Sequence, residues 1–355
     1  MASLEGDFSP LIKALTSQRP PYSVVYAALG TGTIVCDSQP FSFQVRCANL
    51  VAMKPGFLRL LSACVAVAAF SAIVFSQTPT PSPTPAPPST DIFLIDITTT
   101  RTGNLKVGQP VKITDWSGYN NQPAFMPDGK SILYTSIREK QADIYRFDIG
   151  TAATTQVTNT PESEYSPTLM PDGKSISVVR VESDGTQRLW KFPLAGGAPS
   201  LVLEKIKPVG YHLWVDDDTL ALFVLGKPNT LQLVDLRSGK AEVIAENPGR
   251  ILRRVPHENK FSFVHKVSDQ EWLVKIFDLK TRNVATFIKT FPGVEDYAWT
   301  PSGVLLMANE SKLFGRKKSD FAWVELADFS HAGLKNITRI AVSPKGDRIA
   351  VVSRQ

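Results

Sequence analysis

The chain has 355 residues, of which 43% are hydrophobic and 20% are charged, and its formal net charge is +6. The excess of positive charge is small and spread out, and basic residues form only one tight cluster, Arg316-Lys317-Lys318. This distribution argues against a nucleic-acid-binding surface. All three cysteines, Cys36, Cys47 and Cys64, precede residue 77, so no disulfide can join residues that follow.

An apolar run from Leu60 to Phe75 follows the basic residues Lys54 and Arg59. This order predicts a secretory signal peptide over residues 53–76, cleaved after Ser76, and therefore a periplasmic or secreted protein. A retained membrane anchor is the alternative, although the run is shorter than the ~20 residues that a spanning helix needs. We interpret residues 1–52 as a mis-annotated upstream segment.

Residues 77–90 alternate proline with threonine and serine. Proline favours an extended backbone, so we expect a semi-rigid linker here. One domain is then expected over residues 91–355.

One short sequence motif recurs six times in this domain. It is clearest around Pro127-Asp128-Gly129-Lys130 and Pro171-Asp172-Gly173-Lys174, and degenerate copies follow around four positions: Val215, His257, Pro301 and Pro344. The copies are 42 to 44 residues apart. A period near 40–50 residues is typical of β-propeller blades with four strands each.

Each copy contains the strands of one blade. In the first copy we expect an inner strand over 122–126, a second over 131–136, a third over 143–149 and an outer strand over 154–158. Proline, aspartate and glycine favour a tight turn between the first two, and the third alternates apolar and polar residues.

The two ends of the domain complement each other. The last copy stops after two strands, 340–343 and 348–352, whereas Asp91–Ile97 and Pro110–Thr114 match a third and a fourth strand. We therefore predict an all-β, six-bladed β-propeller closed by N- and C-terminal strands that share the last blade, which removes open sheet edges. A β-sandwich of repeated hairpins is the alternative.

The Pro-Asp-Gly-Lys turn between apolar strands, preceded by the segment Thr158–Pro167, resembles the WD40-like PD40 repeat of TolB-type six-bladed propellers. The likeness covers residues 91–355 and is most specific in the copies at Pro127 and Pro171. It implies a periplasmic module that docks other proteins.

Catalytic motifs are absent from the sequence. It has no Gly-x-Ser-x-Gly elbow and no His-Glu-x-x-His pair. We therefore expect no enzymatic activity, no cofactor and no metal. The alternative is a propeller lyase or hydrolase that acts on a polysaccharide or small metabolite with a metal in the channel, because His212 and His257 fall near equivalent places in adjacent blades.

Loops on a rigid scaffold commonly carry binding residues. The loops that enter the inner strands should converge at one mouth of the channel. The binding residues expected there are Asn120, Asn121, Glu162, Glu164, Tyr165, Tyr211, Arg253, Arg254, Glu295 and Asp296. We expect a monomer whose partner is an envelope protein or peptide, with no nucleic acid and with membrane contact only through an uncleaved signal or the partner. The six tryptophans are interpreted as packing between blades.

Overall fold

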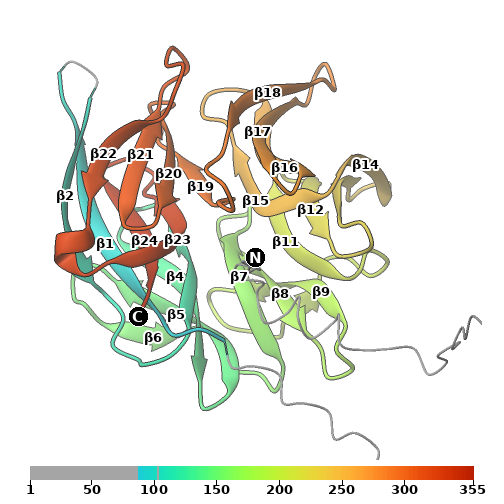
Figure 1. The fold of residues 1–355 in the computed structure, drawn as a ribbon. Coiled ribbons are helices and arrows are strands. Elements are labelled where there is room, and N and C mark those ends of the chain that lie inside the picture. Colours follow the sequence, from blue (N-terminus) through green and yellow to red (C-terminus); the bar gives the residue numbers. More distant parts are fainter. Residues whose placement is uncertain (1–86, 102–103) are drawn as a thin grey trace, which may run out of the picture. The chain divides into compact units, whose positions relative to one another are not determined.

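The computed structural model describes residues 87–101 and 104–355. The expected signal peptide and the segment before it lie outside these residues. The described residues form six four-stranded antiparallel sheets, which are the blades of the predicted propeller (Figure 1). Apart from a single 3₁₀ turn, Ser330–Ala332, they contain no helix, and none of them forms a helix long and apolar enough to cross a membrane.

Five blades are continuous in sequence, and their strands follow one another from the inside outward. Blade 1 consists of β3 (Asn120–Phe125), β4 (Ser131–Arg138), β5 (Gln141–Asp148) and β6 (Thr154–Gln156). Blade 2 consists of β7 (Ser163–Leu169), β8 (Ser175–Val181), β9 (Gln187–Pro193) and β10 (Ser200–Leu201). Blade 3 consists of β11 (Val209–Trp214), β12 (Thr219–Val224), β13 (Thr230–Asp235) and β14 (Lys240–Glu246).

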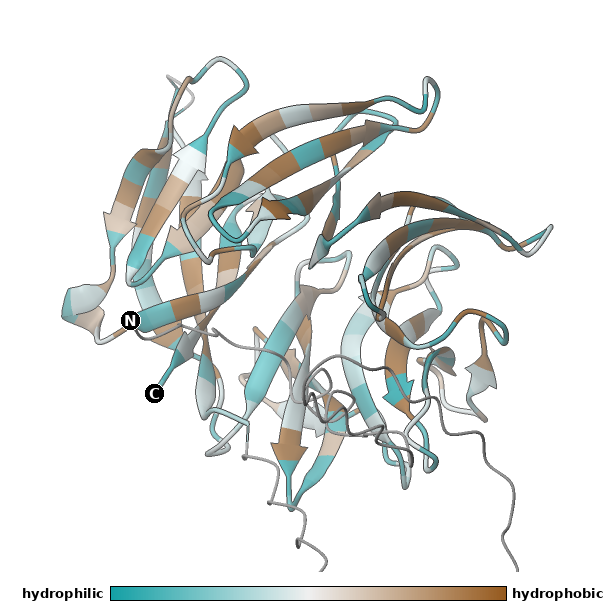
Figure 2. Cartoon of the chain, turned by 45° about the vertical axis from the view of Figure 1, so that its right-hand side comes forward, coloured by the Kyte–Doolittle hydropathy of each residue, from teal (hydrophilic) through white to brown (hydrophobic). Residues whose placement is uncertain are grey.

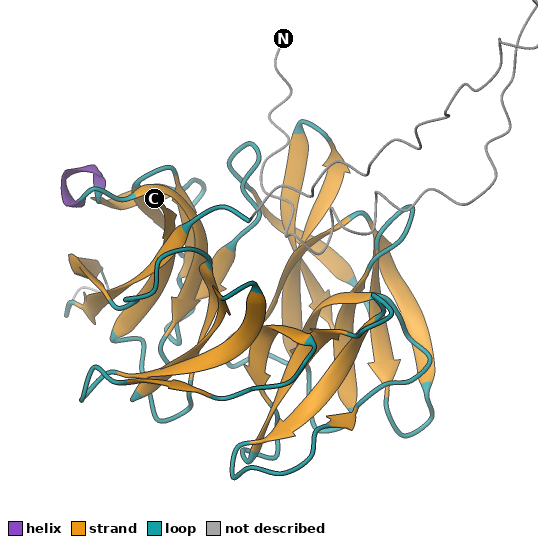
Figure 3. Ribbon diagram, turned by 90° about the horizontal axis from the view of Figure 1, so that it is seen from below, coloured by secondary structure: helices purple, strands orange, loops and turns teal. Residues whose placement is uncertain are grey.

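The remaining blades complete the ring (Figure 3). Blade 4 consists of β15 (Pro248–Arg254), β16 (Lys260–Ser268), β17 (Glu271–Asp278) and β18 (Val284–Lys289). Blade 5 consists of β19 (Tyr297–Trp299), β20 (Leu305–Asn309), β21 (Lys312–Arg316) and β22 (Val324–Asp328). Blade 6 consists of β23 (Lys335–Val342), β24 (Arg348–Arg354), β1 (Thr90–Thr99) and β2 (Leu105–Lys112).

The predicted closure of blade 6 is confirmed. β1 lies antiparallel to β24, with Ile92 opposite Val352 and Ile95 opposite Ile349. All four side chains are buried. The strand that begins the domain therefore completes the sheet that ends it, as the sequence predicts.

Several strand boundaries differ from the sequence prediction by a few residues, and two turn positions differ by one. The outer strand of blade 6 begins at Leu105 rather than at Pro110, because its hairpin with β1 extends as far as Thr99. The residue that takes the place of Pro127 is Asp216 rather than Val215 in blade 3, where the Val215 N–H donates to the Thr219 carbonyl, and Pro256 rather than His257 in blade 4. The Val255 N–H donates to the Lys260 carbonyl just as the Met126 N–H donates to the Ser131 carbonyl.

The hydrophobic core lies between blades rather than inside one layer. Successive side chains of a strand point to opposite faces of its sheet. In β12, Leu220 and Leu222 belong to a cluster with blade 2, whereas Ala221 belongs to a cluster with blade 4. Corresponding clusters occur at each of the other blade interfaces. Figure 2 shows hydrophobic residues on the strands and mostly hydrophilic ones on the loops.

Candidate functional site

The six innermost strands share one register at the channel. In each blade a backbone N–H of the inner strand donates to a carbonyl at or near the start of the second strand and closes the tight turn. These residues are Met126, Met170, Val215, Val255, Thr300 and Ser343. The residues four positions earlier are therefore equivalent, and we call them the channel ring: Gln122, Ser166, Tyr211, Ile251, Asp296 and Arg339.

Bulges occur at or next to the level of the channel ring. The pairing of inner and second strands shifts register in blades 1, 2, 3, 4 and 6. Gln122 and Ser166 adopt positive φ angles of 58° and 56°. A bulge bends its strand and redirects a side chain, so irregular backbone is what presents these side chains to the axis.

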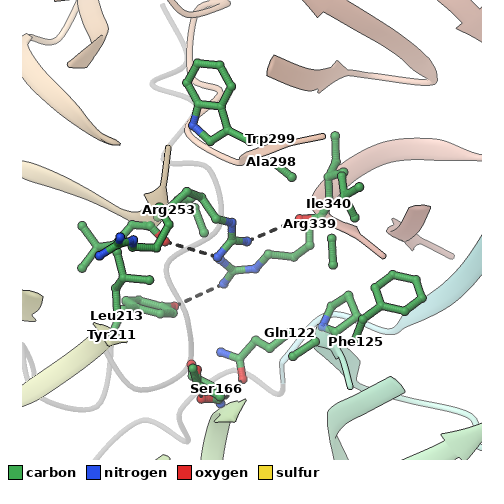
Figure 4. Close-up of a pocket in the computed structure, with 18 of the residues that line it drawn as sticks. Gln122, Phe125, Ser166, Tyr211, Leu213, Arg253, Ala298, Trp299, Arg339 and Ile340 are labelled. Atoms are coloured by element: carbon green, nitrogen blue, oxygen red, sulfur yellow. Dashed lines mark hydrogen bonds between the residues drawn. The ribbon is translucent and has the colours of Figure 1, made fainter. Parts of the chain in front are cut away.

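Arg339 reaches across the channel from blade 6 (Figure 4). Its guanidinium donates to Asp296 Oδ2 at 3.3 Å, to Asn121 Oδ1 at 3.3 Å and to Tyr211 Oη at 3.2 Å. Asp296 belongs to blade 5 and Asn121 to blade 1, whereas Tyr211 belongs to blade 3 on the opposite side. Arg339 is buried, so its charge depends on these partners.

A cavity of about 570 Å³ extends from the channel ring toward the tight turns. All six inner strands line it, together with Pro256, Pro301 and Pro344 of the turns. Most ring residues are buried, whereas Arg254 and Pro344 are exposed, so the cavity opens at the end where the tight turns lie. We call this the turn end, and we call the opposite end, where chains cross between blades, the crossover end.

The cavity is basic. Four arginines line it, namely Arg250, Arg253, Arg254 and Arg339, and none of the described lining residues is Asp or Glu. Lining aromatic residues include Phe125, Tyr211 and Trp299.

Two of these arginines are paired with carboxylates outside the cavity wall. Arg339 pairs with Asp296, and Arg250 lies 3.5 Å from Glu295, which also contacts Lys266 at 3.1 Å. Burial opposes ionisation of Glu295, but Arg250 and Lys266 outweigh it and hold its pKa below the ordinary value.

The other two arginines contact only neutral carbonyls. Arg253 donates to the carbonyl of Ile340 across the channel at 3.4 Å, and Arg254 donates to the carbonyl of Val215. Neither forms an ion pair with another described residue. Their charges therefore give the turn end a positive potential.

The expected binding residues separate into two groups. Tyr211, Arg253 and Arg254 line the cavity, and the two arginines lie at the turn end rather than at the mouth where the sequence analysis expected them. The others lie near the crossover end and mostly face protein. Among them Asn120, Asn121, Glu164, Tyr165 and Asp296 are buried, and Glu162 and Glu295 are half-buried.

Asn120 illustrates the second group. Its amide donates to the carbonyls of Trp116 and Thr90, and its Oδ1 accepts from Ser136. These bonds tie blade 1 to the loop before it and to blade 6. Buried amides in such networks commonly hold a fold together.

Glu164 is fully buried between blades 1 and 2. Its Oε1 accepts from Arg180 at 3.0 Å and from Thr160 at 2.5 Å. Burial raises the pKa of Glu164 to about 7 against these contacts, and burial also raises the pKa of nearby Asp143.

Sequence reasoning missed Gln122, Arg250, Trp299 and Arg339. The signal for Gln122 and Arg339 was the fixed offset from the turn, because a residue four positions before each turn-closing N–H belongs to the ring. Trp299 was interpreted as packing between blades. Trp299 does connect blades 5 and 4, because its Nε1–H donates a hydrogen bond to Ser262 Oγ in blade 4. It also lines the cavity.

The two histidines of the metal alternative make separate contacts. His212 is buried in β11 and its Nε2 lies 2.7 Å from Ser177 Oγ. Burial lowers the pKa of His212 to about 3. His257 is exposed in a tight turn and contacts the Pro301 carbonyl. Within 87–101 and 104–355, no three His, Cys, Asp or Glu side chains are grouped so that they could hold a metal ion.

Comparison with models of known protein families shows to which family the chain belongs. The model of the PD40 family, the TolB beta propeller domain, matches residues 71–301. The chain belongs to the TolB β-propeller family. A search of curated proteins finds no match for this TolB-type propeller.

Several solved structures are similar to the chain. A protein from Agrobacterium tumefaciens provisionally assigned as TolB is 18% identical, with a TM-score of 0.56, over 76% of this chain and 99% of that chain. TolB from Acinetobacter baumannii is also 18% identical, with a TM-score of 0.49, over 75% of this chain and 64% of that one. An oligogalacturonate lyase in complex with manganese is 12% identical, with a TM-score of 0.46, over 76% of this chain and 99% of the lyase.

Proposed function

We propose that this TolB-type propeller is an exported, non-enzymatic module of the cell envelope that binds a protein or peptide partner at the turn end of its channel. The observation that carries the proposal is the open cavity of about 570 Å³ lined by all six inner strands. A concave site with apolar walls and a few directed polar groups is the usual form of a binding site.

Rigid surroundings support this choice of site. The floor of the cavity is the channel ring, in which Arg339 bridges opposite blades. Its rim is made of tight turns that close through backbone hydrogen bonds. Binding to such a preorganised surface loses little conformational entropy.

The side chains at the turn end also suit a protein partner. Arg253, Arg254 and Trp299 line the cavity, and tryptophan and arginine are enriched among residues that dominate binding energies. At the crossover end, by contrast, Asn120, Asn121 and Asp296 are buried within the protein.

Site-specific photocrosslinking in intact cells tests the proposal. A photoreactive residue at exposed Pro344 is placed on the rim of the turn end, and a matched one at exposed Pro161 marks the crossover end. We expect a defined protein adduct from position 344 that is lost in an Arg253→Gln, Arg254→Gln background. An adduct confined to position 161, or none at either position, would contradict the proposal.

A further inference from the structure

A second cavity adjoins the first at the turn end. It has a volume of about 920 Å³ and lies between blades 4 and 5, where its lining includes His257, Phe287 and Lys317. Pro256 and Trp299 line both cavities. The two cavities therefore meet at the Pro256 and Trp299 side chains, and we call the two cavities together, across this shared wall, the path.

The second cavity has its own cation without a carboxylate partner. It is lined by two carboxylates, and both are paired with lysines. Lys260 lies 2.6 Å from Glu258 and 3.7 Å from Asp278, and Lys318 lies 3.8 Å from Glu258. Lys317 Nζ contacts only the amide oxygen of Asn104, at 3.4 Å, and forms no ion pair with a described residue. The basic cluster seen in the sequence thus places one available ammonium on this path.

A buried donor at the channel end of the path also lacks an acceptor. Gln122 is 8% exposed, and its Oε1 accepts from Thr135 and from the Ser166 N–H. Its Nε2 has no hydrogen-bond partner among the described residues, and Figure 4 draws the amide within the cavity. An ordered water, or a polar group of a ligand that enters the cavity, can supply the acceptor that this buried donor lacks within the described chain.

We propose that this path binds an extended acidic peptide segment, with carboxylates against Arg253, Arg254 and Lys317 and the peptide backbone crossing Trp299. The inference rests on the proposed function and specifies the chemistry of the partner. The guanidinium groups of Arg253 and Arg254, which have no carboxylate partner among the described residues, and the unpaired Gln122 amide are all donors, and carboxylates supply charged acceptors.

The shape of the path favours a peptide over a compact ligand. Each cavity alone falls within the usual range of about 300–1,000 Å³ for a small-molecule site. Two such cavities in series, joined at an aromatic side chain, fit an occupant that is long and narrow. Aromatic side chains at such a junction can pack against apolar parts of a peptide.

Fluorescence anisotropy with a fluorescein-labelled (Glu-Ser)6 peptide tests the inference on the full-length protein. We expect saturable binding that weakens as salt is raised, because exposed charge pairs are screened. The matched peptides (Gln-Ser)6 and (Lys-Ser)6 should bind at least tenfold more weakly. Equal binding of the glutamine peptide, or no binding of the glutamate peptide, would overturn the inference.

Variants locate the binding on the path. The double variant Arg253→Gln, Lys317→Gln should bind the (Glu-Ser)6 peptide at least tenfold more weakly than the wild type. Arg237→Gln with Lys312→Gln removes the same charge from exposed ion pairs elsewhere and should change binding less than twofold. Arg253→Lys with Lys317→Arg keeps the charges and should retain most of the binding. Equal loss in both glutamine pairs would overturn the assignment.

Two further outcomes separate the sources of failure. A labelled galacturonate dodecamer that binds more tightly than the peptide, and loses binding in Arg253→Gln with Lys317→Gln, would replace the peptide by an acidic polysaccharide. If the adduct at position 344 forms but no glutamate peptide binds, the acidic chemistry is wrong and the proposed function stands. If neither is observed, both are wrong.

Discussion

At the scale of single residues, the channel is organised around one buried charge. Arg339 has three partners in three other blades, and the Asp296 carboxylate also accepts the Ile340 N–H at 2.8 Å. A buried charge is tolerated only when it is paired and hydrogen-bonded. Arg339 therefore both closes the floor of the cavity and joins opposite sides of the ring.

The first prediction concerns this ion pair. Arg339→Met should lower the free energy of unfolding by about 3–5 kcal/mol, because Asp296 is left as an uncompensated buried charge. The double variant Arg339→Met, Asp296→Asn should lose less free energy of unfolding than the two single variants lose together. Urea unfolding measures all three variants, and strictly additive losses would show that the pair is not coupled.

The second prediction concerns the pH dependence that Glu164 contributes. Its pKa of about 7 in the fold lies above the ordinary value of 4.5, mainly through burial. The stability that the protonated form supplies is therefore present below about pH 4.5 and is lost as the pH rises through 7. As the pH rises from 5 to 8, the wild type should lose this stability and Glu164→Gln should not. The free energy of unfolding of the variant minus that of the wild type should therefore increase by up to about 3 kcal/mol.

Thermal and urea unfolding of both proteins at several pH values check this. Asp172→Asn serves as the control. Burial alone would raise the pKa of Asp172, but hydrogen bonds to Lys191 and to turn backbone N–H groups outweigh it and lower the pKa to about 2, so the stability difference of this variant from wild type should stay constant between pH 5 and pH 8. A stability difference between Glu164→Gln and wild type that stays constant from pH 5 to pH 8 would contradict the assignment.

At the scale of elements, the inner strands of blades 1, 2, 3, 4 and 6 combine a regular ladder with a bulge near the channel ring. The bulge of β15 depends on Gly249, where an added Cβ would lie 2.7 Å from the Val264 Cβ and 2.8 Å from Glu295 Oε2. Glycine is needed there because backbone and neighbouring strand approach closely. The irregular segment carries Arg250 to the cavity, and the regular ladder that follows it carries Arg253 and Arg254.

The third prediction follows from that contact. Gly249→Ala should lower the free energy of unfolding by about 1–3 kcal/mol, since neither neighbour can move freely. Gly150→Ala is the matched control, because its added Cβ meets only Asp148 Oδ1 at 3.5 Å. Chemical unfolding compares the two variants, and equal stabilities would rule out crowding at Gly249.

At the scale of the whole molecule, the described domain has a core distributed around a ring. Every blade packs through both of its faces, and the final interface depends on β1 reaching β24. Loss of any interface exposes apolar surface on two blades at once. Such a ring should unfold as one unit, with blade 6 as the segment that links the two ends of the domain.

The fourth prediction tests the closure. Ile92→Ala should lower the free energy of unfolding by about 2–5 kcal/mol, because the fully buried side chain packs between blades 6 and 1. Val111→Ala, on the outer strand of the same blade and 64% exposed, should change stability by less than about 0.5 kcal/mol. Circular dichroism and tryptophan fluorescence should report one coincident transition for each variant. Separate transitions would contradict a cooperative ring.

The sequence by itself determined the number of blades, the position of the tight turns and the shared last blade. These features are local or periodic: strands alternate every two residues, turns require proline, aspartate and glycine, and the copies recur every 42 to 44 residues. Arg253 and Tyr211 were also identified as candidates, although from an argument about the opposite end of the channel.

Only the tertiary structure decided which residues meet at the axis. Arg339 contacts Tyr211 from 128 positions away, and Trp299 lines two cavities whose lining residues come from different blades. Bulges set the direction of these side chains, and a one-residue shift of register turns a side chain to the other face of its sheet. The periodic pattern therefore specifies the ring, whereas the closure of the ring brings the basic path together.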